Sequence, residues 1–211
     1  MGGDTNKQFL ELLGHPILWY SLRAFDQCDD VDAVVVVRRP DDAQRTEQLV
    51  RCFRKVVAMT DGGPERQDSV WNGLQKCPPN SEIVAVHDGA RPLVTPSLIS
   101  ATVSSARLHG TGIAATKIVD TIKEADETRS ILRTVDRRRL WAVQTPQTLR
   151  FELLCRAYAA VRERGIVVTD EAAAVELLGE PVKLVETTFL NLKVTAPNDL
   201  ATVEALLRCR G

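Results

Sequence analysis

Short, continuous apolar runs alternate with longer amphipathic stretches along the first half of the chain. Residues 33–37, 56–59 and 83–86 form three such runs, rich in Val, Ile and Ala. Runs that are apolar at every position are typical of strands covered on both faces, as in a parallel sheet. The alternation therefore predicts a doubly wound, mostly parallel α/β sheet of Rossmann-like type.

The rest of the pattern places the other elements. After Gly110, short strands joined by polar turns predict a β-arm over about residues 116–140, set within a single domain of residues 1–211. Strands are predicted at 112–117, 120–124, 130–135, 182–186 and 191–194. Helices are predicted at 16–27, 41–53, 69–76, 96–109, 151–164, 170–178 and 197–207.

Charge and cysteine content exclude several classes of protein. A net charge of −1 carries no basic excess that would indicate a nucleic-acid partner. The five cysteines are scattered and form no C-x-x-C pair, which is typical of reduced thiols rather than a disulfide framework or zinc site. No apolar run is long enough to span a bilayer, and no signal peptide is recognisable at the N-terminus, so we expect a cytoplasmic protein without a membrane partner.

Asp88 follows the predicted strand at 83–86 almost at once. Ligands of open α/β sheets lie beyond the carboxyl ends of the strands, and a carboxylate there can hold Mg²⁺ against a triphosphate. Arg91, three residues on, could clamp a phosphate. Position alone favours plainer explanations: an Asp-Gly turn for Asp88 and a solvated loop arginine for Arg91.

The segment 61–69 follows the predicted strand at 56–59 and contains Gly62 and Gly63, which permit close approach of a ligand ring. Ser69 could contact a base or simply cap a helix. Lys7 and Lys193 suit phosphate, although isolated lysines are usually solvated, as is a basic run such as 137–139. The three histidines show no metal-ligand spacing, and we assign them no catalytic role. The chain has neither a P-loop nor a G-x-G-x-x-G motif.

Nine short motifs occur in order along nearly the whole chain. They are KQF at 7–9, GGPERQDSV at 62–70, HDGARP at 87–92, DTIK at 120–123, TVDR at 134–137, LW at 140–141, QTPQ at 144–147, TDEA at 169–172 and LKVT at 192–195. Taken together, these motifs resemble those of the 2-C-methyl-D-erythritol 4-phosphate cytidylyltransferases, enzymes of the non-mevalonate isoprenoid pathway, and their number and order make the resemblance specific.

The resemblance implies a nucleotidyltransferase fold and a role for each matching residue. Lys7, Arg137 and Lys193 would act in catalysis, and Asp88 would hold Mg²⁺ or another divalent cation. CTP would be bound by Gly62, Gly63, Ser69, Asp88 and Gly89. The substrate phosphate would be surrounded by Arg91, Thr121, Arg137, Thr169 and Lys193. Thr121 and Arg137 would reach into a partner's active site on the β-arm, which implies a homodimer.

The implied reaction moves CMP from CTP to the substrate phosphate. That phosphate has a second pKa of about 6, so its attacking oxygen is already anionic and needs no general base. Positioned cations bring the two polyanions together and neutralise charge on the transferring group, without a covalent enzyme intermediate.

The N-terminus departs from the family pattern. Family members begin with a buried strand and a glycine-rich loop, whereas here Met1-Gly2 aligns with the end of that loop and Asn6 replaces a proline. We expect Met1 to be an internal methionine of a longer protein. A missing strand would leave the pairing edges of two neighbours free. The chain alone is then expected to bind CTP weakly and turn over little.

The sequence leaves three alternative functions open. One is a cytidylyltransferase for another polyol phosphate such as ribitol 5-phosphate, although DTIK at 120–123 favours the erythritol phosphate. A second is an inactive dimeric scaffold. The third is a nicotinamide oxidoreductase, which the missing fingerprint argues against.

Overall fold

The computed structural model describes residues 7–209. The expectations for Met1, Gly2 and Asn6 lie outside these described residues. No helix among the described residues is long and apolar enough to cross a membrane.

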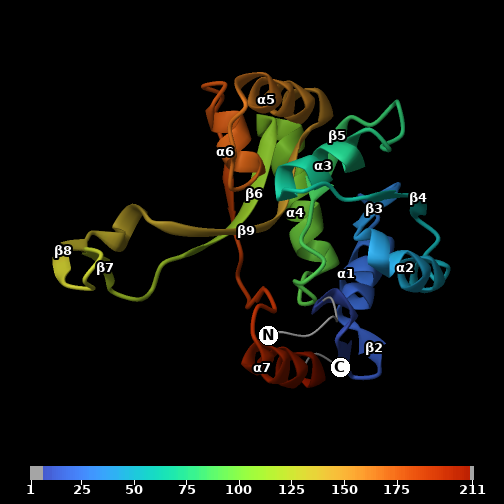
Figure 1. The fold of residues 1–211 in the computed structure, drawn as a ribbon, viewed down its shortest axis with the longest axis horizontal. Helices are drawn as coiled ribbons and strands as arrows, with labels where there is room; N and C mark the ends of the chain where they lie inside the picture. The colour runs from blue at the N-terminus through green and yellow to red at the C-terminus, as the bar shows by residue number, and fades with distance from the viewer. Residues whose placement is uncertain (1–6, 210–211) are drawn as a thin grey trace.

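A mixed four-stranded sheet forms the centre of the molecule (Figure 1). β6 pairs in parallel with β10, whereas β9 is antiparallel to both of its neighbours, β6 and β5. β9 returns from the β-arm into the sheet, and it was not predicted. The α/β fold is confirmed, with this strand as the antiparallel member. In spatial order the strands are β10 (Leu184–Glu186), β6 (Thr111–Lys117), β9 (Trp141–Arg150) and β5 (Ile83–Val86).

A separate parallel pair, β3 (Val34–Arg38) and β4 (Val56–Asp61), lies beside this sheet. Within residues 7–209, no strand pairs with the second edge of β3 or of β5. A groove of about 980 Å³ runs between these two edges and is lined by both strands.

Helices cover both faces of the four-stranded sheet. Ile113 packs with Tyr158 of α5, whereas its neighbour Ala114 packs with Ile99 of α4 on the other face. Successive side chains of a strand point to opposite faces, so the two clusters are the two halves of a doubly covered core. The helices are α1 (Ile17–Asp26), α2 (Ala43–Val50), α3 (Arg66–Leu74), α4 (Pro96–His109), α5 (Phe151–Arg164), α6 (Glu171–Glu176) and α7 (Pro197–Arg208).

Some predicted bounds need correction. α3 begins at Arg66, three residues before the predicted start at Ser69. The Asp68 carboxylate accepts a hydrogen bond from Glu65 N at 3.2 Å, and this contact caps the helix at Glu65. α2 begins only after a 3₁₀ turn, η2 (Pro40–Asp42). The strand predicted at 191–194 is wrong: this segment makes a single backbone bond to the loop after β5, from Val194 N to Ala90 O at 2.8 Å.

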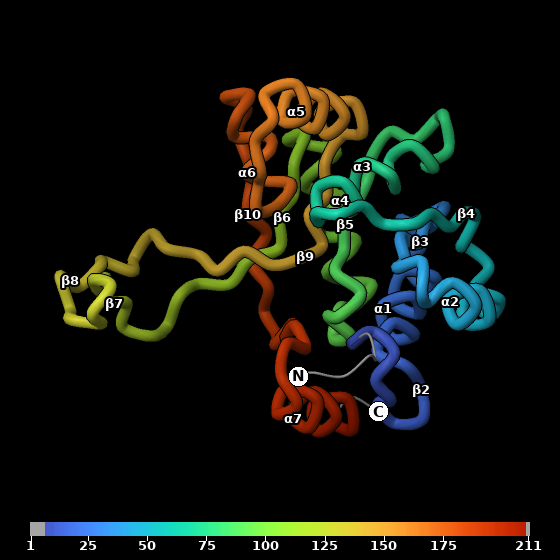
Figure 2. Tube along the Cα trace, viewed as in Figure 1, coloured from blue at the N-terminus to red at the C-terminus, as the bar shows by residue number. Residues whose placement is uncertain are grey.

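A two-stranded hairpin, β7 (Ile122–Ala125) with β8 (Ile131–Val135), projects from the molecule between β6 and β9. Figures 1 and 2 both show it standing far from the helices and the central sheet. The 3₁₀ turn η3 (Arg137–Arg139) follows it. The hairpin, and the segment that joins it to β6, expose large apolar side chains that a hairpin alone cannot bury. Val119 is 77% exposed, Ile131 65% and Leu132 61%.

The remaining elements lie near the start of the described chain. They are η1 (Lys7–Phe9), β1 (Glu11–Leu12) and β2 (His15–Pro16), the last two forming a small antiparallel hairpin. Leu12 of β1 shares an apolar cluster with Ile17 of α1, with Val203 of α7 and with Val194 in the segment before α7. This contact brings the two ends of the described chain together.

Candidate active site

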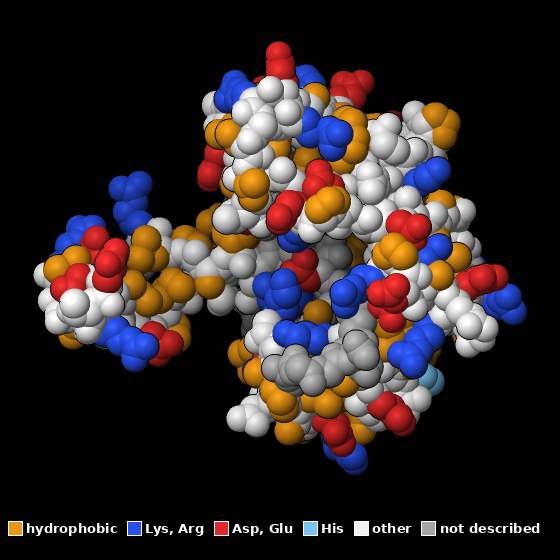
Figure 3. Space-filling model, viewed as in Figure 1, with side chains coloured by type: hydrophobic (Ala, Val, Ile, Leu, Met, Phe, Trp, Pro, Cys, Tyr) orange, Lys and Arg blue, Asp and Glu red, His pale blue; other side chains and the backbone are white. Residues whose placement is uncertain are grey.

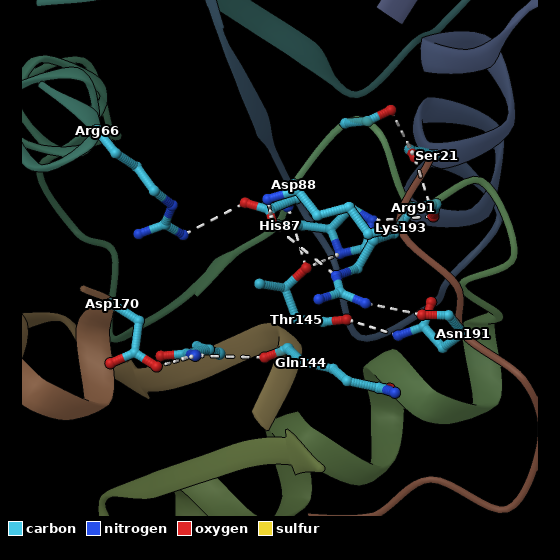
Figure 4. Close-up of polar contacts among 12 residues, drawn as sticks. Ser21, Arg66, His87, Asp88, Arg91, Gln144, Thr145, Asp170, Asn191 and Lys193 are labelled. Carbon is cyan, nitrogen blue, oxygen red and sulfur yellow. Dashed lines mark hydrogen bonds and ion pairs between the residues drawn. The ribbon is translucent and has the colours of Figure 1, made fainter. Parts of the chain in front are cut away.

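Asp88, two residues beyond the end of β5, is surrounded by three cationic side chains (Figure 4). Lys193 Nζ donates to Asp88 Oδ2 at 2.8 Å, and Arg66 Nη2 lies 3.4 Å from Oδ1. Arg91 Nε is 3.8 Å from Oδ2. The four residues come from three distant parts of the chain, and β5 and α3 bring two of those parts together.

The charge of Asp88 is held by these neighbours. Burial alone would raise the pKa of its carboxyl, but the Lys193 hydrogen bond and the charge of Arg66 outweigh burial and hold the pKa below its ordinary value. Asp88 is therefore ionised at neutral pH. Arg91 Nη1 donates to Asn191 O at 2.8 Å, whereas its buried Nε has no hydrogen-bond partner and faces the Asp88 carboxylate.

His87 holds the loop that carries Asp88 and Arg91 in place through hydrogen bonds at both ring nitrogens. Its Nδ1 lies 3.0 Å from Thr145 Oγ1, and its Nε2 lies 3.3 Å from Arg91 O. Asp88 N donates to the same Thr145 Oγ1 at 3.1 Å. A single proton arrangement satisfies the three contacts: the threonine donates to Nδ1 and Nε2–H donates to the carbonyl. His87 is thus a neutral side chain with both ring nitrogens engaged.

This state of His87 predicts a pH-dependent stability. Burial lowers its pKa from 6.5 to about 4 in the folded protein. Between these values the unfolded chain binds a proton that the folded protein does not, so stability is complete above pH 6.5 and falls as the pH drops towards 4. We expect His87 to account for a loss of about 3 kcal/mol in the free energy of unfolding. Urea unfolding at pH 7.5, 6, 5 and 4 measures it. His87→Gln should show a flatter profile, and identical profiles would contradict the assignment.

Gly62 and Gly63, which follow β4, have no room for a side chain. Gly63 N donates to Ser69 Oγ at 3.1 Å, and a Cβ at Gly63 would lie 2.3 Å from the Cβ of Asp68. A Cβ at Gly62 would lie 2.8 Å from Ser69 Oγ. Close approach of a ligand ring at Gly62 and Gly63 stays a prediction. Ser69 does not cap α3 but sits inside its first turn, so that alternative is wrong.

Arg66 and Glu171 form an ion pair that sequence reasoning missed. Arg66 Nη1 lies 2.6 Å from Glu171 Oε1 and Nη2 lies 3.0 Å from Oε2, a two-point contact across 105 residues of sequence. Glu171 is fully buried, and Tyr158 also donates to it at 3.0 Å. Burial would lower the pKa of Arg66, but the hydrogen bonds and charge of Glu171 raise it instead, and burial raises the pKa of Tyr158. Arg66 therefore stays charged between two carboxylates, with Asp88 on its other side.

The other predicted residues fall into two groups. Gly89 lines the groove near Asp88, and a Cβ there would lie 2.8 Å from Leu18 Cδ1. Lys7 Nζ donates to Thr195 O at 2.7 Å, two residues beyond Lys193. Thr169 is exposed just before α6.

Thr121 and Arg137 lie apart from this group, on the projecting arm. Arg137 there donates to the Val119 carbonyl. The fold thus gathers the other predicted residues on the main body and leaves these two on the arm (Figure 2).

The surroundings of Asp88 favour an anionic ligand. Figure 3 shows Lys and Arg side chains gathered around a hollow near the centre of the visible face. The groove between β3 and β5 is lined by Arg38, Gly62, Gly63, Arg66 and Asp88 at this side. Within residues 7–209, no group of three or more His, Cys, Asp and Glu side chains could hold a metal ion. A metal here would need ligand oxygens as well as the Asp88 carboxylate.

Comparisons with known proteins agree on one family. A family model described as IspD, 2-C-methyl-D-erythritol 4-phosphate cytidylyltransferase, matches residues 1–209. The enzyme of that name from Pelotomaculum thermopropionicum is 43% identical over 213 residues, covering 100% of this chain and 90% of that protein. The one from Geobacillus kaustophilus is 44% identical over 212 residues, covering 100% of this chain and 92% of that protein.

Solved structures lead to the same group. The structure described as 4-diphosphocytidyl-2C-methyl-D-erythritol synthase from Anaerococcus prevotii superposes with a TM-score of 0.89 at 27% identity, covering 96% of this chain and 90% of that one. The structure of the cytidylyltransferase from Thermus thermophilus has a TM-score of 0.84 at 33% identity, covering 96% of this chain and 94% of that one.

Proposed function

This chain belongs to the 2-C-methyl-D-erythritol 4-phosphate cytidylyltransferase family, and we propose that it transfers CMP from CTP to 2-C-methyl-D-erythritol 4-phosphate. The products are 4-diphosphocytidyl-2-C-methyl-D-erythritol and pyrophosphate. The observation that carries this proposal is the identity of 43% to a relative of that name, maintained over the full length of the chain. The cationic cluster around Asp88 supports it, because both substrates are phosphate anions.

The reaction follows from the charges at the site. An oxygen of the substrate phosphate attacks the α-phosphorus of CTP, a new O–P bond forms, and the bond to the β-phosphate breaks with its electron pair leaving on pyrophosphate. The attacking oxygen is already ionised near neutral pH, so the site need not contain a general base. His87, buried and bonded at both nitrogens, offers none. Catalysis then rests on positioning and on neutralising phosphate charge.

The residue roles in this proposal follow the geometry around Asp88. Arg91 and Lys193 lie on one side of Asp88 and bind the substrate phosphate, together with Thr169. Lys7 stabilises charge on the triphosphate. The CTP base and ribose lie against the segment between β4 and α3 and the loop after β5, through Gly62, Gly63, Ser69, Asp88 and Gly89.

Mg²⁺ fits this donor set. Asp88 supplies one ionised carboxylate beside a phosphate-binding groove, and Mg²⁺ is typically held by one or two carboxylates plus phosphate oxygens. Asp88 would hold the ion, and the ion, when bound, would neutralise charge on the triphosphate. Arg66, Arg91 and Lys193 orient Asp88 and contribute their own positive charge.

A homodimer completes the proposed site. Thr121 and Arg137 stand on an arm that extends away from Asp88 of the same chain, and the arm exposes large apolar side chains such as Ile131 and Leu132. Exposed apolar patches of this kind mark interaction surfaces. Docking of the arm on a second copy would bury them and bring Arg137 to the partner's substrate phosphate.

Mixing two inactive variants tests this arrangement. Asp88→Asn and Arg137→Ala are each expected to lose most activity alone. After subunit exchange, about a quarter of wild-type activity should return, because half of randomly formed dimers are mixed and each mixed dimer has one intact site. A mixture no more active than its components would contradict a site shared between two chains.

Pyrophosphate release tests the function itself. The chain, CTP and Mg²⁺ are assayed with 2-C-methyl-D-erythritol 4-phosphate and, in parallel, with ribitol 5-phosphate. We expect faster release with the erythritol phosphate; the relatives named above do not favour the alternative polyol. No heat in calorimetry with millimolar CTP and Mg²⁺ would instead favour a scaffold without catalysis. We also propose a cytoplasmic location, because phosphorylated substrates of this kind do not cross membranes unaided.

A further inference from the structure

The first turn of α3 is hydrogen-bonded to the segment between α5 and α6. Gln67 Nε2 donates to Ile166 O at 3.1 Å, and Val168 N donates to Gln67 Oε1 at 2.9 Å. Both ends of one side-chain amide are thus engaged by the backbone of a segment about a hundred residues away. A side chain that makes both bonds fixes the path of that backbone as a neighbouring strand would.

Thr169 directly follows Val168, whose backbone Gln67 holds, and the residue after it, Asp170, is also held by hydrogen bonds. Asp170 accepts from Gln147 Nε2 at 3.0 Å and from Ala173 N at 2.8 Å, which starts α6. Thr169 itself is exposed. It is therefore an exposed hydroxyl held between two residues whose backbone or side chain is fixed by the protein interior.

We propose that Gln67 is a positioning residue, which holds the backbone at Val168 so that the Thr169 hydroxyl meets the phosphate of the second substrate. This inference rests on the proposed function, in which Thr169 binds that phosphate. Gln67 lies in the same turn as Ser69, whose hydroxyl accepts from Gly63 N. The turn that shapes the CTP-binding segment thus also places a group for the other substrate.

Steady-state kinetics on Gln67→Ala separates this role from a general structural one. We expect the KM for 2-C-methyl-D-erythritol 4-phosphate to rise about tenfold, while kcat at saturation and the KM for CTP change less than about twofold. Gln67→Glu keeps an acceptor for Val168 N but turns an oxygen towards Ile166 O, so it should also raise this KM. If Gln67→Ala folds poorly, the KM of Gln67→Glu tests the same role. The control is Gln75→Ala, an exposed glutamine at the other end of α3, which should match wild type.

A double-mutant cycle with Thr169→Val tests whether Gln67 acts through Thr169. If it does, Thr169→Val raises the same KM, and adding Gln67→Ala to it changes the KM no further. If Thr169→Val raises the KM and Gln67→Ala adds its full effect, Gln67 acts elsewhere and the inference is overturned, with the proposed function intact. If Thr169→Val leaves the KM unchanged, the proposed role of Thr169 falls and this inference with it. A lower melting temperature with unchanged KM values would also overturn it.

Discussion

Replacing Asp88 with Asn is expected to lower the kcat for CMP transfer by about 10² to 10³-fold, the range seen when one preorganised electrostatic group is removed from an active site. The two side chains have nearly the same shape, so the change removes mainly a charge. Arg66, Arg91 and Lys193 would then face one another without the anion that separates them. The carboxylate that would hold Mg²⁺ beside the triphosphate is lost as well. Pyrophosphate release at saturating substrates measures the effect.

Two comparisons make this prediction specific. Glu47→Gln removes a carboxylate on α2 whose partner, Arg51, is exposed, and it should leave kcat unchanged. Circular dichroism and urea unfolding should show that Asp88→Asn folds normally, because the loop is still held by His87 and Thr145. A folded Asp88→Asn protein with wild-type kcat would remove Asp88 from the mechanism.

Two helices could be bounded from sequence because their ends carry strong local signals. α4 has Pro96 at its first position, with Thr95 accepting from Leu98 N at 3.3 Å, and Gly110 follows it at a φ of 85°. α5 likewise ends at Gly165, at a φ of 62°. These residues choose their conformations almost independently of the rest of the chain, so a sequence pattern is sufficient to place them.

β9 could not be predicted in this way, because its central residues are polar and buried. Thr148 donates to Thr102 at 2.8 Å, and the amide of Gln147 bonds to Asp170 and to Ala172 N. Polar side chains are normally exposed, and here each is buried only because a distant segment supplies its partner. The strand therefore depends on tertiary contacts that no local pattern reveals.

The candidate site likewise contains residues that the sequence could identify and residues that it could not. The place of Asp88 and Arg91 after a strand made them candidates, but position alone favoured a turn and a solvated loop. Only the family motifs gave these two residues and Lys193 a role. Arg66 and Glu171 each lie in a family motif, but their ion pair could not be predicted, because it joins residues 105 positions apart. A charged residue is exposed by default, so a fully buried Glu171 could be identified only once its partner was in place.

The largest expected loss of stability follows from that pair. Arg66→Leu leaves the Glu171 carboxylate fully buried with Tyr158 as its one remaining partner among the contacts described, and we expect the free energy of unfolding to fall by about 3 to 5 kcal/mol. Adding Glu171→Gln should recover most of that loss, because the second change removes the uncompensated charge while it preserves shape and a hydrogen-bond acceptor for Tyr158. A second substitution that restores stability is a result that simple loss of packing would not produce. Urea unfolding of the single and double variants at pH 7.5 measures both steps.

The matched control is an exposed ion pair on a neighbouring helix. Arg156, on α5, lies 3.3 Å from Glu180, and both side chains are well exposed. Because water solvates either partner when the other is removed, Arg156→Leu should cost less than about 1 kcal/mol, and adding Glu180→Gln should recover nothing measurable. If Arg66→Leu behaves like Arg156→Leu, the Glu171 carboxylate reaches solvent in the variant and the ion pair does not support the fold. If Arg66→Leu is severe and Glu171→Gln fails to rescue it, Arg66 stabilises the protein through Asp88 and the loop after β5 instead.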